Sequence, residues 1–205
     1  MTNEILRATT QHIVIVFVAV VVAAAAGIPI AIAAVRHPRW GRRFLRVIDI
    51  IQTIPSLALF GFLIPLPLIG GIGVRTAIVA LVLYSLLPIV RNTVIGITGI
   101  DPLVREAAIV MGMTDRQRLL SVELPLAMPS ILTGLRVATV IAIGVATIGA
   151  AIGGGGLGTL IFRGVAMVDT TRIMAGALPA AGLALLADLL FSGAEKLAAK
   201  RWGAA

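Results

Sequence analysis

The chain has 205 residues, of which 59% are hydrophobic and 13% charged, and it carries a formal net charge of +8. A water-soluble fold is excluded, because so few polar side chains could not cover so much apolar surface. Cysteine is absent from the sequence, which excludes disulfides, thiol chemistry and cysteine-ligated metals. The mean hydropathy of +1.08 predicts an integral membrane protein.

Five apolar segments are predicted to cross the membrane as helices, so the chain is expected to be an all-α membrane protein with one transmembrane domain over residues 1–205. The first segment, 13–35, contains no charged residue and has about the 20 residues that a bilayer crossing needs. The later segments are 47–66, 76–90, 135–152 and 173–191. The third is short and can continue past Arg91. A cleaved signal peptide is the alternative for the first segment, but the usual basic start is missing, since Glu4 offsets Arg7.

Basic residues set the predicted orientation. Five spans put the two termini on opposite sides of the membrane, and arginine and lysine gather in cytoplasmic loops. Of the 17 basic residues, 13 fall on the face that carries the loop between the first two spans. The other four lie on the opposite face and are Arg7, Arg75, Arg163 and Arg172. The N-terminus is therefore expected outside and the C-terminus in the cytoplasm. The positive charge is explained by topology, so nucleic-acid binding is not expected.

The polar segment 101–125, between the third and fourth spans, predicts a first short helix after Asp101. This aspartate can cap a helix, Pro102 suits the first helical position, and Gly112 offers a C-terminal stop. One face of this helix carries Leu103, Ala107 and Met111.

A second short helix is predicted from Thr114, because Thr114 and Gln117 have the spacing of a capping box. Pro125 and Pro129 are expected to end it before the fourth span. Both helices are too short to be stable alone and need a partner surface. That surface is either the lipid headgroups or a groove in a cytoplasmic protein.

The stretch Arg105 to Pro125 reads REAAIVMGMTDRQRLLSVELP. It resembles the EAA loop of permease subunits of ABC-type importers, in which EAA is followed by three residues, G, nine residues, a hydrophobic residue, any residue and LP. The matching positions are Glu106, Ala107, Ala108, Gly112, Val122, Leu124 and Pro125. The resemblance implies a coupling helix that sits in a cleft of a separate ATP-binding subunit.

The resemblance also implies which residues dock. They are expected to be Glu106, Ala107, Ala108, Gly112, Met113, Thr114, Asp115, Leu124 and Pro125. The two small alanines would let the partner approach closely, and the glycine would permit the tight bend. Glu106 is the candidate for an ionic contact, either across the interface or back onto the loop itself.

The resemblance covers nearly the whole chain and narrows to osmoprotectant permeases, which import glycine betaine, choline, carnitine or related compounds. It is carried by IQTIPSLAL (51–59), LYSLLPIVRNT (83–93), MGMTDRQRLLSVELPLA (111–127), GGGGLGTLIFRG (153–164) and ADLL (187–190). A permease for D-methionine or another small amino-acid-like compound is the alternative, because such permeases are similar around 153–158. Either reading implies a type I, methionine-permease-like core that works by alternating access.

The partners implied are two copies of the ATP-binding subunit, a second permease that is identical or related, and an extracytoplasmic binding protein, in a prokaryotic cytoplasmic (inner) membrane. The chain itself is expected to be non-catalytic, without cofactor or metal. No Walker A motif is possible, because the only lysines, Lys196 and Lys200, do not follow glycine, so the partner must bind ATP-Mg. With 4% aromatic residues, a cation–π cage for a quaternary ammonium is not expected either. An ATPase-independent channel or carrier is the alternative from another class.

Polar and glycine residues near the spans are candidates for the pathway or its gate. They are Gln52, Thr53 and Pro55, together with Gly153, Gly154, Gly155, Gly156 and Gly158. Plain helix packing is the other reading of the glycines. Charged residues near span ends are expected to form ion pairs, to be solvated at the membrane interface, or to form an inner gate; they are Asp49, Arg91, Arg136 and Asp188.

Overall fold

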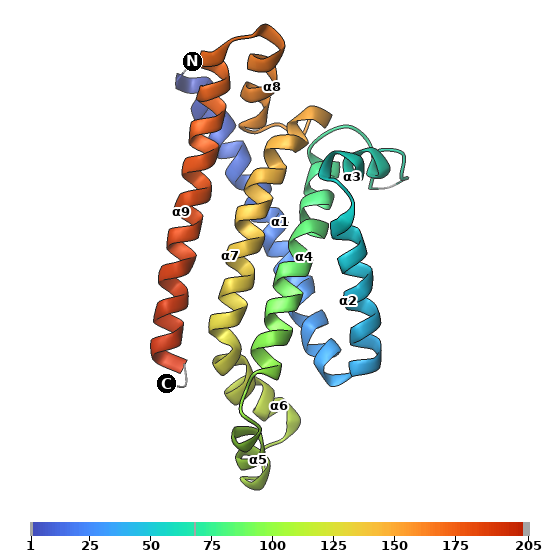
Figure 1. Cartoon of the computed structure of the whole chain (residues 1–205), viewed down its shortest axis with the longest axis vertical. Helices are drawn as coiled ribbons and strands as arrows, with labels where there is room; N and C mark the ends of the chain where they lie inside the picture. The colour runs from blue at the N-terminus through green and yellow to red at the C-terminus, as the bar shows by residue number, and fades with distance from the viewer. Residues whose placement is uncertain (1, 68, 203–205) are drawn as a thin grey trace.

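The structure is a computed structural model that describes residues 2–67 and 69–202, and its regular elements within these ranges are all helical. In chain order they are α1 (Thr2–Arg36), α2 (Pro38–Thr53), α3 (Ser56–Leu63), α4 (Val74–Thr98), α5 (Pro102–Val110), α6 (Asp115–Arg118), the π turn η1 (Leu119–Glu123), α7 (Leu124–Gly149), the 3-10 turn η2 (Ala150–Ile152), α8 (Gly158–Met167) and α9 (Thr170–Trp202). The lower end of the bundle carries α5, α6 and the C-terminal end of the chain, and the upper end carries the N-terminal end, α3 and α8 (Figure 1).

Within the described ranges, α1, α4, α7 with its preceding turns, and α9 are long and apolar enough to cross a membrane. The bent pair of α2 and α3 can supply a fifth crossing. The all-α membrane fold is therefore confirmed, with four candidate spans in the described ranges, or five if the bent pair counts as one. The helices run beyond the predicted spans, and α4 continues past Arg91 to Thr98, as its short apolar stretch suggested.

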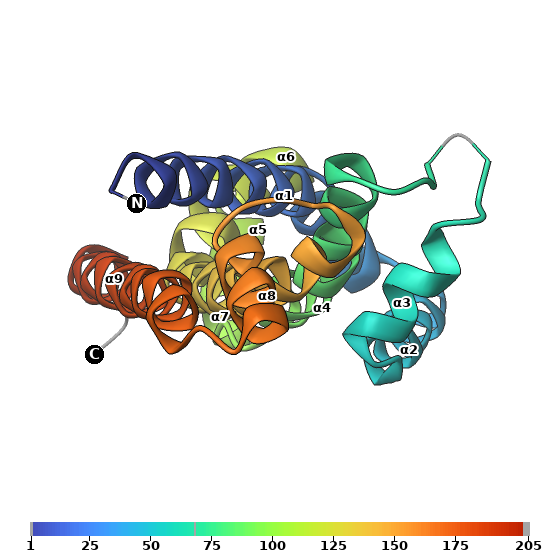
Figure 2. The same cartoon turned by 90° about the horizontal axis from the view of Figure 1, so that it is seen from above.

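Helices α4 and α7 form the centre of the bundle and pack along each other. Helix α1 crosses both on one face, while α9 lies along α7 and the α2–α3 pair lies on the opposite flank beside α4 (Figure 2). The main apolar core gathers where α1, α3, α4 and α7 meet, and fully buried members include Ala19, Phe60, Leu81 and Ala142.

Two glycines allow α4 and α7 to approach closely. A methyl group built on Gly134 of α7 would lie 2.8 Å from the Pro88 carbonyl oxygen, and one on Gly96 of α4 would lie 2.8 Å from the Cβ of Ser130. Helices in lipid lack a hydrophobic driving force for association, so they depend on close packing at small residues. These two positions fix the spacing of the central pair.

The predicted second span, 47–66, is broken at Pro55. Helix α2 ends at Thr53 and α3 begins at Ser56, and the two axes differ by 103°. Proline has no backbone N–H, and it disfavours a helical conformation in the residue before it; Ile54 accordingly has an extended backbone with ψ of 123°. Helix α3 therefore turns sideways at the upper end of the flank beside α4 (Figures 1 and 2).

The predicted end of the second polar helix at Pro125 and Pro129 is wrong. Helix α6 passes through η1 directly into α7, so Asp115–Ile152 forms one continuous helical run. Pro125 lies in the first turn of α7, just after a π turn in which the N–H of Leu124 donates to the oxygen of Leu119. In an ordinary α-helix the ring of Pro125 would clash with the preceding turn. The wider π turn lies immediately before this ring, and the helix continues past it.

Candidate functional site

The polar segment 101–125 projects from the lower end of the bundle, below α4 and α7 (Figure 1). Its first helix begins as predicted: the side chain of Asp101 accepts a hydrogen bond from the N–H of Leu103 at 2.8 Å, and Pro102 occupies the first turn. The capped start satisfies a backbone donor that would otherwise lack a partner.

The turn and the second helix also follow the predicted chemistry. Gly112 has a φ of 78°, the left-handed region that glycine enters without strain. The capping box is complete, since Thr114 accepts from the N–H of Gln117 and the Gln117 side chain accepts from the N–H of Thr114 at 2.9 Å. The result is a regular helix–turn–helix tip rather than an irregular loop.

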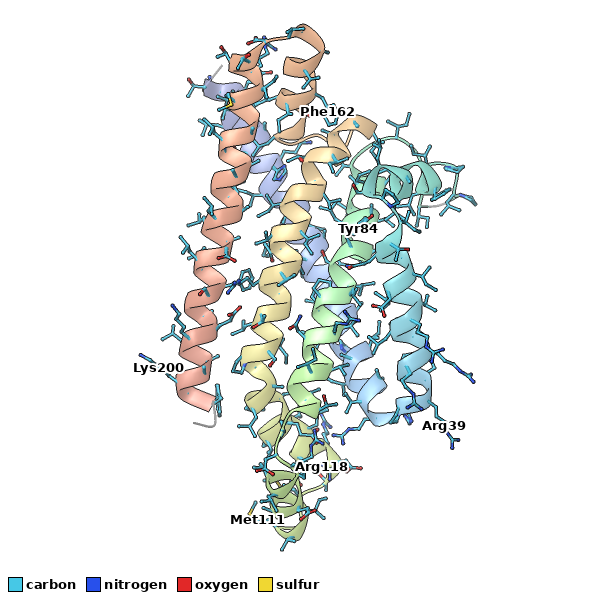
Figure 3. The ribbon with its side chains drawn as sticks, in the orientation of Figure 1. Arg39, Tyr84, Met111, Arg118, Phe162 and Lys200 are labelled. Carbon is cyan, nitrogen blue, oxygen red and sulfur yellow. The ribbon has the colours of Figure 1, made fainter. Side chains whose placement is uncertain are left out.

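An apolar face of this tip is open to its surroundings. Leu103, Ala107 and Met111 share it and are all exposed, and Val110 is 87% exposed. Met111 lies near the lower end of the molecule (Figure 3). Short amphipathic helices that leave such a face uncovered are suited to a groove in another protein.

Within the EAA triplet, Glu106 is accessible to a partner and Ala108 is not. Glu106 is exposed and makes no ion pair or hydrogen bond within the part of the chain that the structure describes. A contact back onto the loop, one of the two expected roles, is therefore not made. Ala108 is only 1% exposed, so it packs inside the tip, and of the two alanines only Ala107 remains accessible.

The other predicted docking residues divide by exposure. Gly112, Thr114 and Asp115 are exposed, whereas Met113, Leu124 and Pro125 are half-buried. Asp115 pairs with Arg118 across one helical turn at 2.7 Å. Leu124 and Pro125 belong to the first turn of α7, so they lie at the root of the tip rather than on its open face.

Glu123 is a functional candidate that the sequence reasoning missed. It is 2% exposed and contacts three guanidinium groups, those of Arg36, Arg105 and Arg118. The signal available in the sequence was a carboxylate directly before an apolar span, which must be paired if it is buried. Its partners could not be read from the sequence, since Arg36 lies 87 positions away.

The candidate pathway residue Gln52 is bound to α4. Proline at position 88 has no N–H, so the carbonyl of Tyr84, one turn earlier, loses its helical donor. The side-chain amide of Gln52 donates to that carbonyl at 2.7 Å. In return, the hydroxyl of Tyr84 donates to the carbonyl of Ile54 at the break between α2 and α3 (Figure 3). Two prolines thus create the polar contacts that fasten α2 to α4.

Thr53 and Pro55 are exposed at this break, and the Thr53 hydroxyl donates to Ile50 of its own helix at 2.7 Å. The glycine segment 153–158 lies on the other side of the upper end of α4, where a methyl group on Gly154 would come within 2.9 Å of the Ala77 Cβ. No interaction in the described ranges joins these two sets of residues.

The glycine segment is held closely against α1. The N–H of Gly156 donates to the side chain of Gln11 at 3.1 Å, and a methyl group on Gly156 would lie 2.9 Å from Nδ1 of His12. Gly155 and Gly156 have φ values of 78° and 72°. Only glycine adopts this conformation readily and admits α1 so closely.

The charged residues near span ends form the expected ion pairs. Arg91 of α4 contacts Asp49 of α2 at 3.3 Å. Arg136 of α7 contacts Asp188 of α9 at 2.8 Å and Glu195 at 3.3 Å. Each pair joins a central helix to a flanking one.

The bundle with its helical tip has the fold of ABC-importer permeases. It is similar to a chain of the methionine ABC transporter MetNI in an inward-facing conformation, with a TM-score of 0.88, 97% of each chain covered and 21% sequence identity. The chain belongs to the family of binding-protein-dependent transport system inner membrane components, which it matches over residues 23–203. It is therefore an inner-membrane permease component of a transport system.

Two curated relatives are similar over most of their length. The osmoprotectant import permease protein OsmW of Salmonella typhimurium (strain LT2) is 47% identical over 184 residues, which cover 89% of this chain and 86% of the relative. The glycine betaine/carnitine/choline transport system permease protein OpuCD of Bacillus subtilis (strain 168) is 44% identical over 193 residues, covering 94% of this chain and 83% of the relative.

Proposed function

We propose that this chain is the membrane-spanning subunit of an ATP-driven importer for osmoprotectants such as glycine betaine, choline or carnitine. The observation that carries the proposal is the identity of 44% and 47% to permeases named for these substrates. Quaternary ammonium groups are bound well by aromatic cages, and this chain is only 4% aromatic. Substrate capture is therefore assigned to a separate extracytoplasmic binding protein, and this subunit provides the gated path.

The helical tip of α5 and α6 is the proposed docking site for the ATP-binding subunit. Its apolar face around Leu103, Ala107 and Met111 is exposed, and the carboxylate of Glu106 has no partner within residues 2–67 and 69–202. Both features fit a surface that is completed by another chain. The partner binds ATP-Mg and hydrolyses it, and the permease is non-catalytic.

The proposed assembly contains two permeases and two ATP-binding subunits. Large apolar faces of this chain stay uncovered on both flanks of the bundle: Leu185 and Leu189 of α9 are 67% and 69% exposed, and Phe62 of α3 is 65% exposed. Lipid and a second permease, identical or related, are the proposed occupants of these faces. Five helices from one chain are few for a closed pathway.

The lower end is proposed to face the cytoplasm. Arg36, Arg39 and Lys200 all lie at this end, whereas Arg163 belongs to α8 at the upper end (Figures 1 and 3). The N-terminus is then outside. In this orientation the break at Gln52, Thr53 and Pro55 and the glycine segment 153–158 lie near the external end, on either side of α4, as a candidate external gate for alternating access.

The substrate assignment is tested by uptake into proteoliposomes that contain the complete complex. Labelled glycine betaine is the tracer, and unlabelled choline, carnitine, proline and methionine compete. We expect ATP-dependent uptake that choline or carnitine inhibits and methionine does not. Inhibition by methionine alone would move the assignment to amino-acid import, and uptake by the permease without ATP would indicate a channel or carrier.

The docking assignment is tested by reversing the charge of Glu106. A Glu106→Arg variant is expected to bind the ATP-binding subunit about tenfold more weakly, because a complementary charge contact becomes repulsive. Lys200→Glu is the matched control, since Lys200 is exposed at the same end but on α9 (Figure 3). Co-purification and transport-coupled ATPase activity are measured for both variants, with membrane insertion as the reference. Equal co-purification of the two variants would remove the docking role.

A further inference from the structure

Glu123 lies where four helices meet at the lower end of the bundle. It is the last residue of η1 and stands directly before α7. Arg36 is the last residue of α1, Arg105 belongs to α5 and Arg118 is the last residue of α6. One buried carboxylate therefore contacts the end of α1 and both helices of the tip. Arg118 lies within the tip, above Met111, in Figure 3.

The three contacts differ in strength. Arg36 donates to Oε2 of Glu123 at 2.7 Å, the distance of a charge-assisted hydrogen bond. The Nε atoms of Arg105 and Arg118 lie 3.5 Å from Oε1 and make no hydrogen bond in the described structure. The carboxylate is thus hydrogen-bonded to α1 and makes longer ion pairs to the two helices of the tip.

Two further contacts extend the cluster. Arg105 also donates to the carbonyl of Ile97 near the end of α4. Arg118 is also paired with Asp115 at 2.7 Å. The tip is therefore joined to α4 through Arg105 and to α1 through Glu123. A cleft of about 340 Å³ opens beside the arginines and is lined by Val35 and Ile109 as well, so this junction is not packed solid.

We propose that Glu123 is a positioning residue that transmits movement of the tip to α1. The proposal rests on the proposed docking of the tip to an ATP-binding subunit. Helices α4 and α7 continue into the tip through the backbone, whereas α1 has no such connection. Helix α1 packs on α4 and α7, and Arg36 adds an ion pair from its end to Glu123. Without the carboxylate, three guanidinium groups would face one another and repel, and α1 would no longer follow the tip.

The first test measures substrate transported per ATP hydrolysed in proteoliposomes. Coupling free energies between sites correspond to factors of about 5 to 150, and we expect Glu123→Gln to lower this ratio about tenfold while ATP hydrolysis continues. Glu123→Asp keeps the charge and is expected to recover most of the ratio. Arg36→Gln removes the partner of Glu123 on α1. Its matched control is Arg39→Gln, because Arg39 is exposed near the same junction and makes no ion pair in the described ranges.

Replacing the Arg36–Glu123 ion pair by a covalent cross-link tests whether the pair acts as a mechanical link or only stabilises the structure. The sequence has no cysteine, so Arg36→Cys combined with Glu123→Cys introduces one addressable pair. We expect this double variant to be uncoupled, and short bifunctional thiol reagents of two lengths to restore substrate transported per ATP. A monofunctional reagent of the same chemistry should restore nothing.

Three outcomes decide the proposal. An unchanged transport ratio in both Glu123→Gln and Arg36→Gln overturns it, as does a cross-linked pair that stays uncoupled with both reagents. If Glu123→Gln does not insert into the membrane, Arg36→Gln and the cysteine pair carry the test. Failure of the docking proposal is recognised separately, because Glu106→Arg would then co-purify with the ATP-binding subunit as the wild type does.

Discussion

Replacing Gly134 by alanine tests whether the contact between α4 and α7 is set by backbone approach. A methyl group at this position would lie 2.8 Å from the Pro88 carbonyl oxygen and 3.2 Å from the Cα of Ile89. Ordinary van der Waals contact begins at 3.4 Å, so the two backbones must separate by about 0.6 Å. Backbone atoms cannot swing aside as a flexible side chain can, and overpacking of this kind costs about 1–3 kcal/mol.

Gly144→Ala is the matched control, because it lies in the same helix and a methyl group there would meet no atom within 4 Å in the described structure. Both variants gain about 1 kcal/mol of helix propensity, so the difference between them isolates the steric cost. We expect Gly144→Ala to be equal to or more stable than the wild type and Gly134→Ala to be about 1–3 kcal/mol less stable than Gly144→Ala. Denaturation in mixed detergent micelles, followed by circular dichroism, measures the difference. Equal stability of the two variants would refute the reasoning.

Three smaller predictions follow from polar contacts. Asp101→Ala removes the cap on Leu103 and should cost about 1 kcal/mol, seen as faster hydrogen exchange of α5 amides; unchanged exchange would argue against the cap. Gln52→Leu leaves the Tyr84 carbonyl without its donor and should cost about 1–3 kcal/mol in the same denaturation assay, whereas a neutral result would mean that water replaces the amide. Arg136→Gln removes a partly exposed link to two carboxylates of α9 and should cost about 0.5–1 kcal/mol, with faster proteolysis of α9 as the readout; protection equal to the wild type would contradict it.

The polar tip was predictable from the sequence because its signals are local. The cap at Asp101, the turn at Gly112 and the capping box at Thr114 each depend on residues within a few positions, and all three are present. Local rules failed at Pro125. A proline was expected to end a helix, but a π turn just before it changes the local geometry, and the sequence has no simple signal for such a turn.

Contacts between distant segments were not predictable in the same way. The proline at position 88 does indicate that the Tyr84 carbonyl needs another donor, but not that Gln52, 32 positions earlier, supplies it. The burial of Glu123 could be suspected from its place before an apolar span, but its three arginine partners come from three different helices. Such partners depend on how whole helices cross, which no short pattern encodes.

The unbroken helical run from Asp115 to Ile152 has a consequence for the kind of motion that can cross the bundle. A flexible tether passes on only a pull along its length, whereas a continuous helix also resists twisting, because each turn is hydrogen-bonded to the next. A rotation of the helix at Asp115 would therefore be transmitted along its whole length to the glycine segment that begins at Gly153.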